Sequence, residues 1–527
     1  MRRWLFADQL GPEFLDDPKQ PVLLIESKAV FRRRRFHRQK AHLILSALRH
    51  RAAELGDQAM FLQTETYREA LAQVDEPLTA CGPTSRGADR FVRRLPNVEV
   101  LPERGYGTTK AEFAAWTKER GGRRLLMEDF YRNARLRHGL LMDGDEPAGG
   151  KWNLDHDNRE PPPKGDRLGV KEPYWPTEDE IDEQVRADLD RWEREDGITF
   201  VGADGPRLFA ATRSEALSAL RRFISGRLAT FGPYEDAMLA EDWTMAHSLL
   251  SAPMNLGLIS PVECAQRAEQ AYRKGEAPLQ SVEGYVRQLI GWRDYIWNIY
   301  WHVDEDLKTS PGDASSKESD QPDYRSRNYL DAHEDLPAWF ANLDADAVEA
   351  RCLSDALRGV RDRAWVHHIP RLMVLGNYAL QRGWDPEQLT DWFHRCFIDG
   401  YDWVMLPNIV GMSQHADGGL MATKPYAAGG AYINRMSDYC SGCAFAPSKR
   451  LGDDACPYTA GYWWFLARNE SRLSGNARMR QPLFGLKRLK DVPAVVAQEE
   501  DRANAAPRVV RSGEDANEGV RQPDLHE

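Results

Sequence analysis

The sequence predicts a two-part protein, with an α/β unit of the doubly wound, Rossmann-like kind followed by a large all-α unit. In the first hundred residues short apolar runs alternate with a helical pattern, whereas from Ser214 onward the pattern is almost wholly helical. A polar stretch rich in glycine, proline and charge separates the two. With 527 residues, 42% of them hydrophobic, and 16 tryptophans, the chain can build two or three domains with substantial cores.

The first unit is expected to span residues 1–140. Its apolar runs predict strands at Trp4–Ala7, Val22–Glu26, Met60–Leu62 and Val98–Leu101, and the face formed by Ile44, Leu48, Ala52 and Leu55 predicts a helix over Phe36–Leu55. No G-x-G-x-x-G follows the first strand, which argues against a dinucleotide on a glycine turn. A ligand at the carboxyl ends of the strands remains possible.

The polar stretch predicts an interdomain linker over residues 141–205, and the all-α unit is expected at 206–491. Beyond 492 the chain is charged and short of aromatic residues, so residues 492–527 are expected to be a disordered tail. Helical periodicity predicts helices at Ser214–Thr230, Pro261–Lys274, Ser281–Tyr300, Ala347–Val360, Arg363–Gln381 and Pro386–Phe397.

Four cysteines have a spacing typical of metal or cluster ligation. Cys440 and Cys443 form one C-x-x-C hook, Cys456 precedes a proline, and Cys352 lies upstream. Four thiolates can hold zinc or an iron–sulfur cluster, but a zinc module usually has two such hooks. The Cys–Pro pair favours an iron–sulfur cluster modestly over zinc. Alternatively, Cys352 is an ordinary buried thiol.

Composition narrows the class of protein further. The net charge of −11 excludes a uniformly basic nucleic-acid binder, although a local basic groove stays possible. The chain has no apolar run of eighteen residues, and its first residues turn polar too early for a signal peptide. We therefore expect a cytoplasmic protein without a membrane partner, in which Cys81, Cys264 and Cys396 are reduced thiols.

Three segments of the helical unit contain groups that could bind a nucleotide cofactor. Residues 247–261 are rich in hydroxyl groups around helix starts, where backbone N–H groups suit a pyrophosphate. Residues 287–297 add Arg293, and residues 397–403 supply the carboxylates of Asp399 and Asp402. Each of these groups could equally be a helix cap.

These segments, in this order, make the chain resemble the photolyase/cryptochrome superfamily. The stretches Leu140–Gly144, Gly149–Asn153 and Leu406–Ser413 resemble its bacterial iron–sulfur branch of prokaryotic (6-4) photolyases and cryptochrome-like proteins. The resemblance runs from Leu5 to about Arg488.

The resemblance implies three bound groups. A [4Fe–4S] cluster would be ligated by Cys352, Cys440, Cys443 and Cys456. An antenna, 6,7-dimethyl-8-ribityllumazine, would lie in the first unit near Asp8, Gln9, Glu26 and Lys40. FAD would lie in the helical unit, against His247, Ser248, Leu249, Leu250, Ser251, Asn255, Gln288, Arg293, Asn377, Asp399 and Asp402.

The resemblance also gives a role to the adjacent histidines, which without it could be two core residues. His368 would donate a proton to the electron-reduced lesion and His367 would support it, since neighbours on a helix point about 100° apart. Trp392 matches the flavin-proximal tryptophan of an electron relay. Two departures stand out: Phe393 replaces a frequent tyrosine, and no tryptophan lies eight residues before Cys352, which leaves Trp339 as a non-equivalent substitute.

The function so implied is light-driven repair of pyrimidine(6-4)pyrimidone photoproducts in UV-damaged DNA by a monomeric enzyme. Reduced FAD would be the electron donor, with histidine-assisted proton transfer. The alternatives are a cryptochrome-like blue-light photoreceptor, and a photolyase for cyclobutane dimers, which the histidine pair disfavours.

Overall fold

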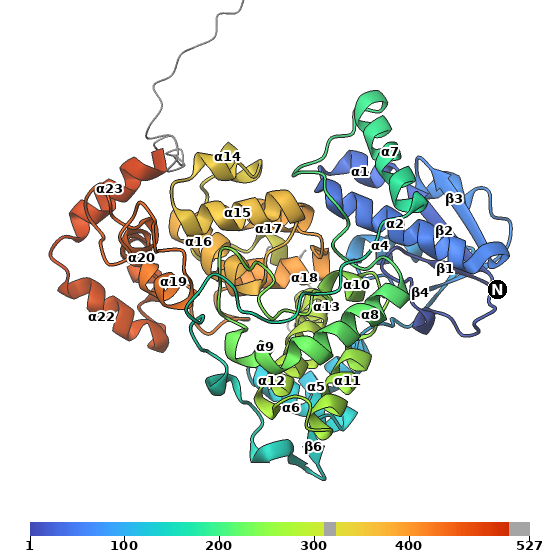
Figure 1. Cartoon of the computed structure of the whole chain (residues 1–527), viewed down its shortest axis with the longest axis horizontal. Helices are drawn as coiled ribbons and strands as arrows, with labels where there is room; N and C mark the ends of the chain where they lie inside the picture. Colours follow the sequence, from blue (N-terminus) through green and yellow to red (C-terminus); the bar gives the residue numbers. More distant parts are fainter. Residues whose placement is uncertain (310–322, 505–527) are drawn as a thin grey trace, which may run out of the picture.

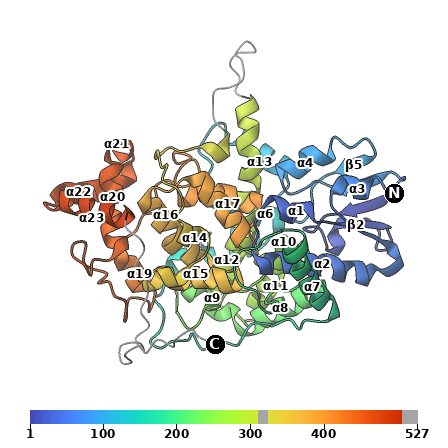
Figure 2. The ribbon, with the colours of Figure 1, turned by 90° about the horizontal axis from the view of Figure 1, so that it is seen from above.

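The computed structural model describes residues 1–309 and 323–504. The N-terminal sheet lies at one end of the long axis, and helices α20 (Pro457–Arg468), α22 (Arg480–Arg488) and α23 (Val492–Asn504) lie at the other (Figure 1). A quarter turn of the molecule gives the same order, with most of the remaining helices between the two ends (Figure 2).

The sheet is parallel and has the strand order β3-β2-β1-β4-β5. Its strands are β1 (Arg2–Leu5), β2 (Val22–Ser27), β3 (Ala59–Thr64), β4 (Leu78–Cys81) and β5 (Val98–Leu101). The order reverses at β1, which is the topology of a doubly wound unit with a ligand site at the carboxyl ends of β1 and β4. The sequence did not predict β4, a run of four residues closely flanked by proline and glycine.

The helices packed around this sheet include one from the segment that was expected to be a linker. Helices α1 (Ala29–Arg33), α2 (Arg38–Leu55), α3 (Tyr67–Leu71) and α4 (Arg86–Val92) come from the first hundred residues. Helix α7 (Glu180–Glu195), inside the expected linker, returns to α2 and buries Val185, Leu189 and Trp192 against it and Phe31. The boundary at 141–205 therefore needs correction, because these apolar side chains recur at helical spacing within a stretch that is polar on average.

The expected end of the first unit at residue 140 also differs from the structure. Helices α5 (Lys110–Glu119) and α6 (Met127–His138) pack on α13 (Asp294–Thr309) and on the π-helix Arg287–Arg293, which belong to the helical unit. Their aromatic side chains share one core with that unit.

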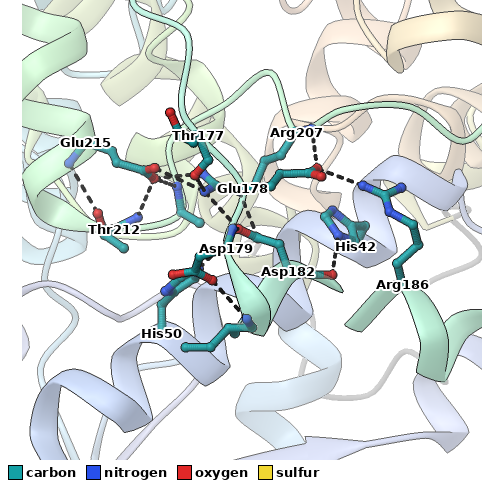
Figure 3. Close-up of polar contacts among 12 residues, drawn as sticks. His42, His50, Thr177, Glu178, Asp179, Asp182, Arg186, Arg207, Thr212 and Glu215 are labelled. Atoms are coloured by element: carbon teal, nitrogen blue, oxygen red, sulfur yellow. Dashed lines mark hydrogen bonds and ion pairs between the residues drawn. The ribbon is translucent and has the colours of Figure 1, made fainter. Parts of the chain in front are cut away.

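Arg207 ties α7 to the start of the helical unit (Figure 3). Its guanidinium donates to both carboxylate oxygens of Asp182 at 2.9 and 3.1 Å and to Glu215 at 2.7 and 3.0 Å. Asp182 is fully buried, and His50 lies 3.5 Å from it. Burial alone would raise the pKa of Asp182, but its bonds to His50 and Arg207 hold that pKa far below its usual value.

The helical unit begins at α8 (Arg213–Gly226) and α9 (Leu228–Tyr234) and continues through helices joined by three π-helical segments. The π-helices are Arg287–Arg293, Pro370–Gly376 and Pro407–Ser413. The α-helices are α10 (Ser251–Asn255), α11 (Pro261–Arg273), α12 (Leu279–Val286), α13, α14 (Ala338–Ala341), α15 (Arg351–Arg363), α16 (Asn377–Arg382), α17 (Pro386–Cys396), α18 (Asp402–Leu406), α19 (Gly430–Met436), α20, α21 (Glu470–Leu473) and α22.

The continuous helix expected at Arg363–Gln381 is wrong. Ala364 has φ +52° and ends α15, an irregular stretch follows to His367, and Pro370 then opens the π-helix. Proline has no N–H to donate to the preceding turn, so it interrupts the interior of a helix but is accepted in the first turn. The histidine pair therefore lies at a helix start.

The expected disorder of the tail is wrong for its first part. Helix α23 packs on α20, burying Val495 and Glu499. Arg382 pairs with the Glu499 carboxylate at 2.7 Å, so a residue that looked like part of a charged tail has a buried partner. The rest of the expected tail, 505–527, lies outside the described residues. Among the described helices, none is both long and apolar enough to cross a bilayer.

Candidate functional site

Three imidazoles gather where the loop before α10 meets the turn after α15. His247 and His367 are buried and stack with ring centroids 4.4 Å apart, while the side chain of His368 is 42% exposed. His368 lies 5.5 Å from His247 and 5.8 Å from His367. Burial lowers the pKa values of His247 and His367 well below the ordinary value, so these two rings are neutral.

This group of histidines has the wrong geometry for a metal centre. The rings of His247 and His367 lie nearly face to face, with 24° between their planes. Imidazole lone pairs lie in the ring plane, so the lone pairs of stacked rings run side by side and do not converge on one ion. A role in proton transfer or substrate contact fits the stack better.

Two adjacent carboxyl groups follow the end of α9 at this site. The Asp236 carboxylate Oδ1 lies 3.3 Å from His368 Nε2. Glu235 is buried, and burial raises its pKa to about 7, although Arg287 opposes the rise. The partly exposed imidazole of His368 thus contacts a carboxylate that is more buried than the ring itself.

Arg227 shapes the loop before α10. Its buried guanidinium donates to the carbonyls of Thr244, Met245 and His247 at 2.5–3.2 Å. Met245 and Leu249 adopt the left-handed conformation, with φ of +45° and +56°. Non-glycine residues with such a backbone occur preferentially at functional sites. Ser248 and Leu249 line a small cavity together with Arg227.

A second polar group lies on the other side of α10. Ser251 Oγ donates to Asp399 Oδ2 at 2.7 Å, Asn255 Nδ2 donates to the Asp399 carbonyl at 2.9 Å, and Arg293 donates to Asn255 Oδ1 at 2.6 Å. Arg371 grips both Asp399 carboxylate oxygens at 2.8 and 3.1 Å. Burial alone would raise the pKa of Asp399, but Arg371 holds it below its usual value.

The structure does not bring all the expected cofactor residues together. Asn377 donates to the Met373 and Ala428 carbonyls, away from Asp399. Asp402 accepts from Tyr300 at 2.8 Å and pairs with Arg325 in a different cavity. Two further residues expected at the cofactor are Gln288 and Leu250. Gln288 lies half-buried in the first π-helix, and Leu250 is buried just before α10.

The cavity that contains Asp402 opens between the sheet and the helical unit and measures about 910 Å³. Of the four antenna candidates Asp8 lines it, and burial raises the pKa of this carboxyl to about 6. Gln9, next to Asp8, donates to the carbonyls of Cys81, the last residue of β4, and Gly82. Lys40 donates to the His394 and Gly400 carbonyls and lies 5.5 Å from the Tyr401 ring, which lines the cavity.

Glu26 lies apart from this cavity and has a structural partner. Arg49 donates to both of its carboxylate oxygens at 2.8 and 2.9 Å, and Glu26 is buried. The cavity is lined instead by residues that sequence analysis did not single out, including Thr84, Arg325 and His394.

The four cysteines converge from three parts of the helical unit. Cys352 lies in the first turn of α15, Cys440 and Cys443 lie in the turn after α19, and Cys456 caps α20. All four line one small cavity, and none is in a disulfide. Gly430 is required beside them, because a Cβ at that position would lie 2.7 Å from the Cys456 sulfur. Four thiols around one cavity suit either zinc or an iron–sulfur cluster.

A series of aromatic rings starts close to Asp399. Arg371 lies over the Phe397 ring, and Trp392 is 5.8 Å from that ring. From Trp392 the ring contacts continue through Phe340, at 4.4 Å, to Trp384 at a further 4.7 Å. Trp384 contacts half-buried Trp339 at 6.0 Å and Tyr378 at 5.6 Å. Phe340 thus connects Trp392 to Trp384, and it also contacts the Trp339 ring directly at 5.7 Å.

Sequence reasoning missed four residues of this region: Arg227, Asp236, Arg371 and Trp384. Arg371 had a usable signal, since it follows His367 by four residues and so falls one helical turn away. Asp236 had no such signal, because its partner His368 is too distant in sequence for any local pattern. Arg227 had none either, because its partners are backbone carbonyls, which any residue can supply.

Comparisons with known proteins relate the whole chain to one group. Residues 3–196 match the family model described as deoxyribodipyrimidine photo-lyase-related protein. The chain is 37% identical over 509 residues to the (6-4) photolyase of Agrobacterium fabrum, covering 91% of this chain and 94% of that protein. A shorter match, 44% identical over 107 residues, is to the uncharacterized protein R855 of Acanthamoeba polyphaga mimivirus, covering 20% of this chain and 80% of that one.

Two solved structures have a similar fold. A bacterial class III photolyase from Agrobacterium tumefaciens has a TM-score of 0.52 at 16% identity, covering 96% of each chain. The cryptochrome of Synechocystis sp. PCC6803 has a TM-score of 0.51 at 12% identity, covering 97% of this chain and 95% of that one. The identity to the Agrobacterium fabrum protein over nearly the full length, together with this fold, shows that the chain belongs to the photolyase/cryptochrome superfamily, among the relatives of the bacterial (6-4) photolyases.

Proposed function

We propose that this protein is a light-driven DNA repair enzyme that acts on pyrimidine(6-4)pyrimidone photoproducts. The observation that carries the proposal is the 37% identity, over 91% of the chain, to a protein named (6-4) photolyase. The half-exposed His368 beside two buried histidines supports it, because repair of this lesion needs a positioned proton donor.

FAD would be held around α10. When bound, reduced and excited by light, it would supply the electron for the reaction. Ser251, Asn255, Arg293 and Asp399 offer donors and acceptors there, and Arg371 completes the group. Two buried polar atoms without a protein partner, Arg293 Nε and His247 Nε2, fit the need of a flavin nucleotide for hydrogen bonds. Asn377 and Asp402, also expected as cofactor residues, have protein partners outside this group.

A [4Fe–4S] cluster would be ligated by Cys352, Cys440, Cys443 and Cys456. The donor set fits, since all four cysteines line one small cavity. Burial raises the pKa of the Cys456 thiol, but hydrogen bonds from the backbone N–H groups of Thr459 and Tyr458 offset part of this rise. The same contacts would stabilise a ligating thiolate.

His368 would deliver the proton to the lesion. Its Nε2 is held by Asp236, which leaves Nδ1 as the nitrogen that transfers the proton. His367 is buried and neutral, so its role is to position its neighbours rather than to supply a proton. Three exposed arginines would contact DNA phosphates: Arg159, Arg435 and Arg478. They lie on the same side as Asp236, because the charges of Asp236 and of each arginine act on a shared tyrosine, Tyr426 or Tyr432.

Electrons for photoactivation would pass along the tryptophan series. A hole formed on Trp392 would move through the Phe340 contact to Trp384 and on to Trp339, where an external thiol reductant returns the electron. This route needs neither a tyrosine at Phe393 nor a tryptophan before Cys352. It would account for both departures from the relatives.

The remaining assignments follow from the same family membership. The antenna 6,7-dimethyl-8-ribityllumazine would occupy the cavity between the sheet and the helical unit, beside Asp8 and Gln9. The sheet with α7 would form the antenna domain, and the helical unit would be the catalytic domain of a cytoplasmic monomer. A photorepair assay with defined (6-4) and cyclobutane lesions tests the proposal: (6-4) repair supports it, and light-dependent spectral change without repair of either lesion contradicts it.

A further inference from the structure

Asp236 is the nearest charged group to His368, and it comes from a different element. It lies two residues after the end of α9, and 132 residues separate it from the histidine. Its Oδ1 lies 3.3 Å from His368 Nε2, and its side chain is 19% exposed against 42% for His368. The carboxylate is therefore more buried than the imidazole and lies behind it, where it can fix the ring without covering it.

Among the groups around His368, Asp236 is the one whose carboxyl stays ionised at acidic pH. The groups that face His368 are Glu235 and Asp236 after α9, His247 in the loop before α10, and His367 beside it. His247 and His367 are neutral. Burial would raise the pKa of Asp236, yet the hydrogen bond and charge of His368 hold that pKa below its usual value, with smaller contributions from Arg159 and Arg287.

The backbone holds Asp236 in place from both sides. The Ala237 N–H donates to the Tyr234 carbonyl at 3.2 Å and the Glu235 N–H to the Gly232 carbonyl, so the residue lies in a tight turn. Met238 then donates to the Met436 carbonyl at 2.8 Å. A carboxylate on a fixed turn selects one ring orientation and one tautomer of its imidazole partner.

We propose that Asp236 is a positioning residue for His368: its carboxylate accepts the hydrogen bond from Nε2–H and so aims Nδ1–H at the substrate. This inference rests on the proposed repair function and adds to it a residue that acts through the proton donor. In the transfer the Nδ1–H bond breaks, the proton goes to the electron-reduced lesion, and the neutral ring keeps its Nε2–H on Asp236.

The test compares three variants in the full-length, cofactor-loaded protein. Asp236→Asn keeps an oxygen acceptor but removes the charge, Asp236→Ala removes both, and Asp236→Glu restores the carboxylate. Asp155→Asn is the matched control, because Asp155 has 23% side-chain exposure and also belongs to the Arg287 group. The readouts are repair of a (6-4) lesion by chemically pre-reduced protein from pH 6 to 9, and histidine ring ¹⁵N signals assigned through His368→Ala.

The proposal expects Asp236→Asn to shift the basic limb of the repair profile to lower pH by up to about one unit, so that repair falls by up to about tenfold at pH 8 and little at pH 6. Asp236→Ala should in addition lose the Nε2–H tautomer in the ¹⁵N spectrum, Asp236→Glu should regain part of the activity, and Asp155→Asn should leave profile and tautomer unchanged.

Two results would overturn the inference: an unaltered profile in Asp236→Asn, or an unaltered His368 tautomer in Asp236→Ala. If the wild-type protein does not repair the lesion, the proposed function fails, and the ¹⁵N spectrum still tests whether Asp236 sets the tautomer of His368.

Discussion

At the scale of single residues, the two neighbouring histidines differ in exposure rather than in chemistry. His368 reaches solvent and an acidic partner, whereas His367 is buried against His247. An exposed imidazole next to a carboxylate can hold and release a proton, but a buried neutral one cannot easily be charged. From this contrast we propose two distinct roles for the pair.

Replacing His368 by alanine should therefore abolish most repair without loss of FAD. We expect a decrease on the order of 10² or more in the repair rate of pre-reduced protein, the usual cost of losing a positioned acid. Bound FAD, measured by absorbance after denaturation, should stay near the wild-type level. His367→Ala is the control for altered packing and should do less harm. Equal repair by His368→Ala and wild type would refute the assignment.

The proposed electron relay runs through Trp384, whose ring lies closer to Phe340 than the Trp339 ring does, at 4.7 Å against 5.7 Å. Trp384→Phe should slow photoreduction of oxidised FAD under blue light, because phenylalanine is much harder to oxidise than tryptophan. Repair by chemically pre-reduced protein should be unaffected, since it needs no relay. Trp463→Phe, outside this ring series, is the matched control. Transient absorption should show less of the tryptophan radical signal in Trp384→Phe, and an unchanged signal would mean that electrons take another route.

At the scale of elements, the cysteine site joins helices that have no sequence continuity. Helix α15 supplies one thiol, the turn after α19 two, and the start of α20 the last. Ligation by all four would tie these segments together, so cluster binding and local folding should be coupled.

Cys443→Ala should lower solubility and remove the bound cluster. Wild-type protein purified without oxygen should contain about four iron atoms per chain and show a broad visible absorption shoulder. Cys264→Ala removes a buried thiol outside the site, and this control should keep its iron. Stoichiometric zinc without iron in the wild-type protein would contradict the cluster assignment.

The elements also show how far sequence patterns reach. The helix Pro386–Cys396 and most strands agree with the predictions to within a few residues, since their apolar periodicity is strong. The break at Ala364 and the π-helix at Pro370 were missed, because a left-handed alanine leaves no local signal. Helix α23 was missed because its stability comes from Arg382 and α20, which are distant in sequence. The Asp236–His368 contact was missed for the same reason.

At the scale of the whole molecule, His37 links the sheet unit to the helical unit. Its Nδ1 accepts from the Gln39 N–H at 3.2 Å, which requires the neutral ring, and its Nε2–H donates to the Arg361 carbonyl at 2.9 Å. Gly202 makes room for this ring, since a Cβ there would lie 1.8 Å from Nε2. Burial lowers the pKa of His37 to about 4.

This depressed pKa predicts acid sensitivity. Between pH 6.5 and 4 the unfolded chain binds a proton that folded His37 does not, so stability decreases as the pH falls through that window. The contribution is about 3 kcal/mol at most. His37→Asn keeps the cap on Gln39 and should flatten the dependence of Tm on pH between 6.5 and 4. His156→Asn, at a fully exposed position, should not. The same slope in both variants would exclude this role for His37.

The central claim is that this protein repairs (6-4) photoproducts with light. The most direct measurement illuminates the pre-reduced, full-length protein with two oligonucleotides, one carrying a (6-4) photoproduct and the other a cyclobutane dimer, and counts restored bases by chromatography. We expect restoration of the (6-4) site in light alone, none in the dark, and little of the cyclobutane site. No restoration of the (6-4) site, with FAD bound and reduced, would contradict the account and favour a photoreceptor.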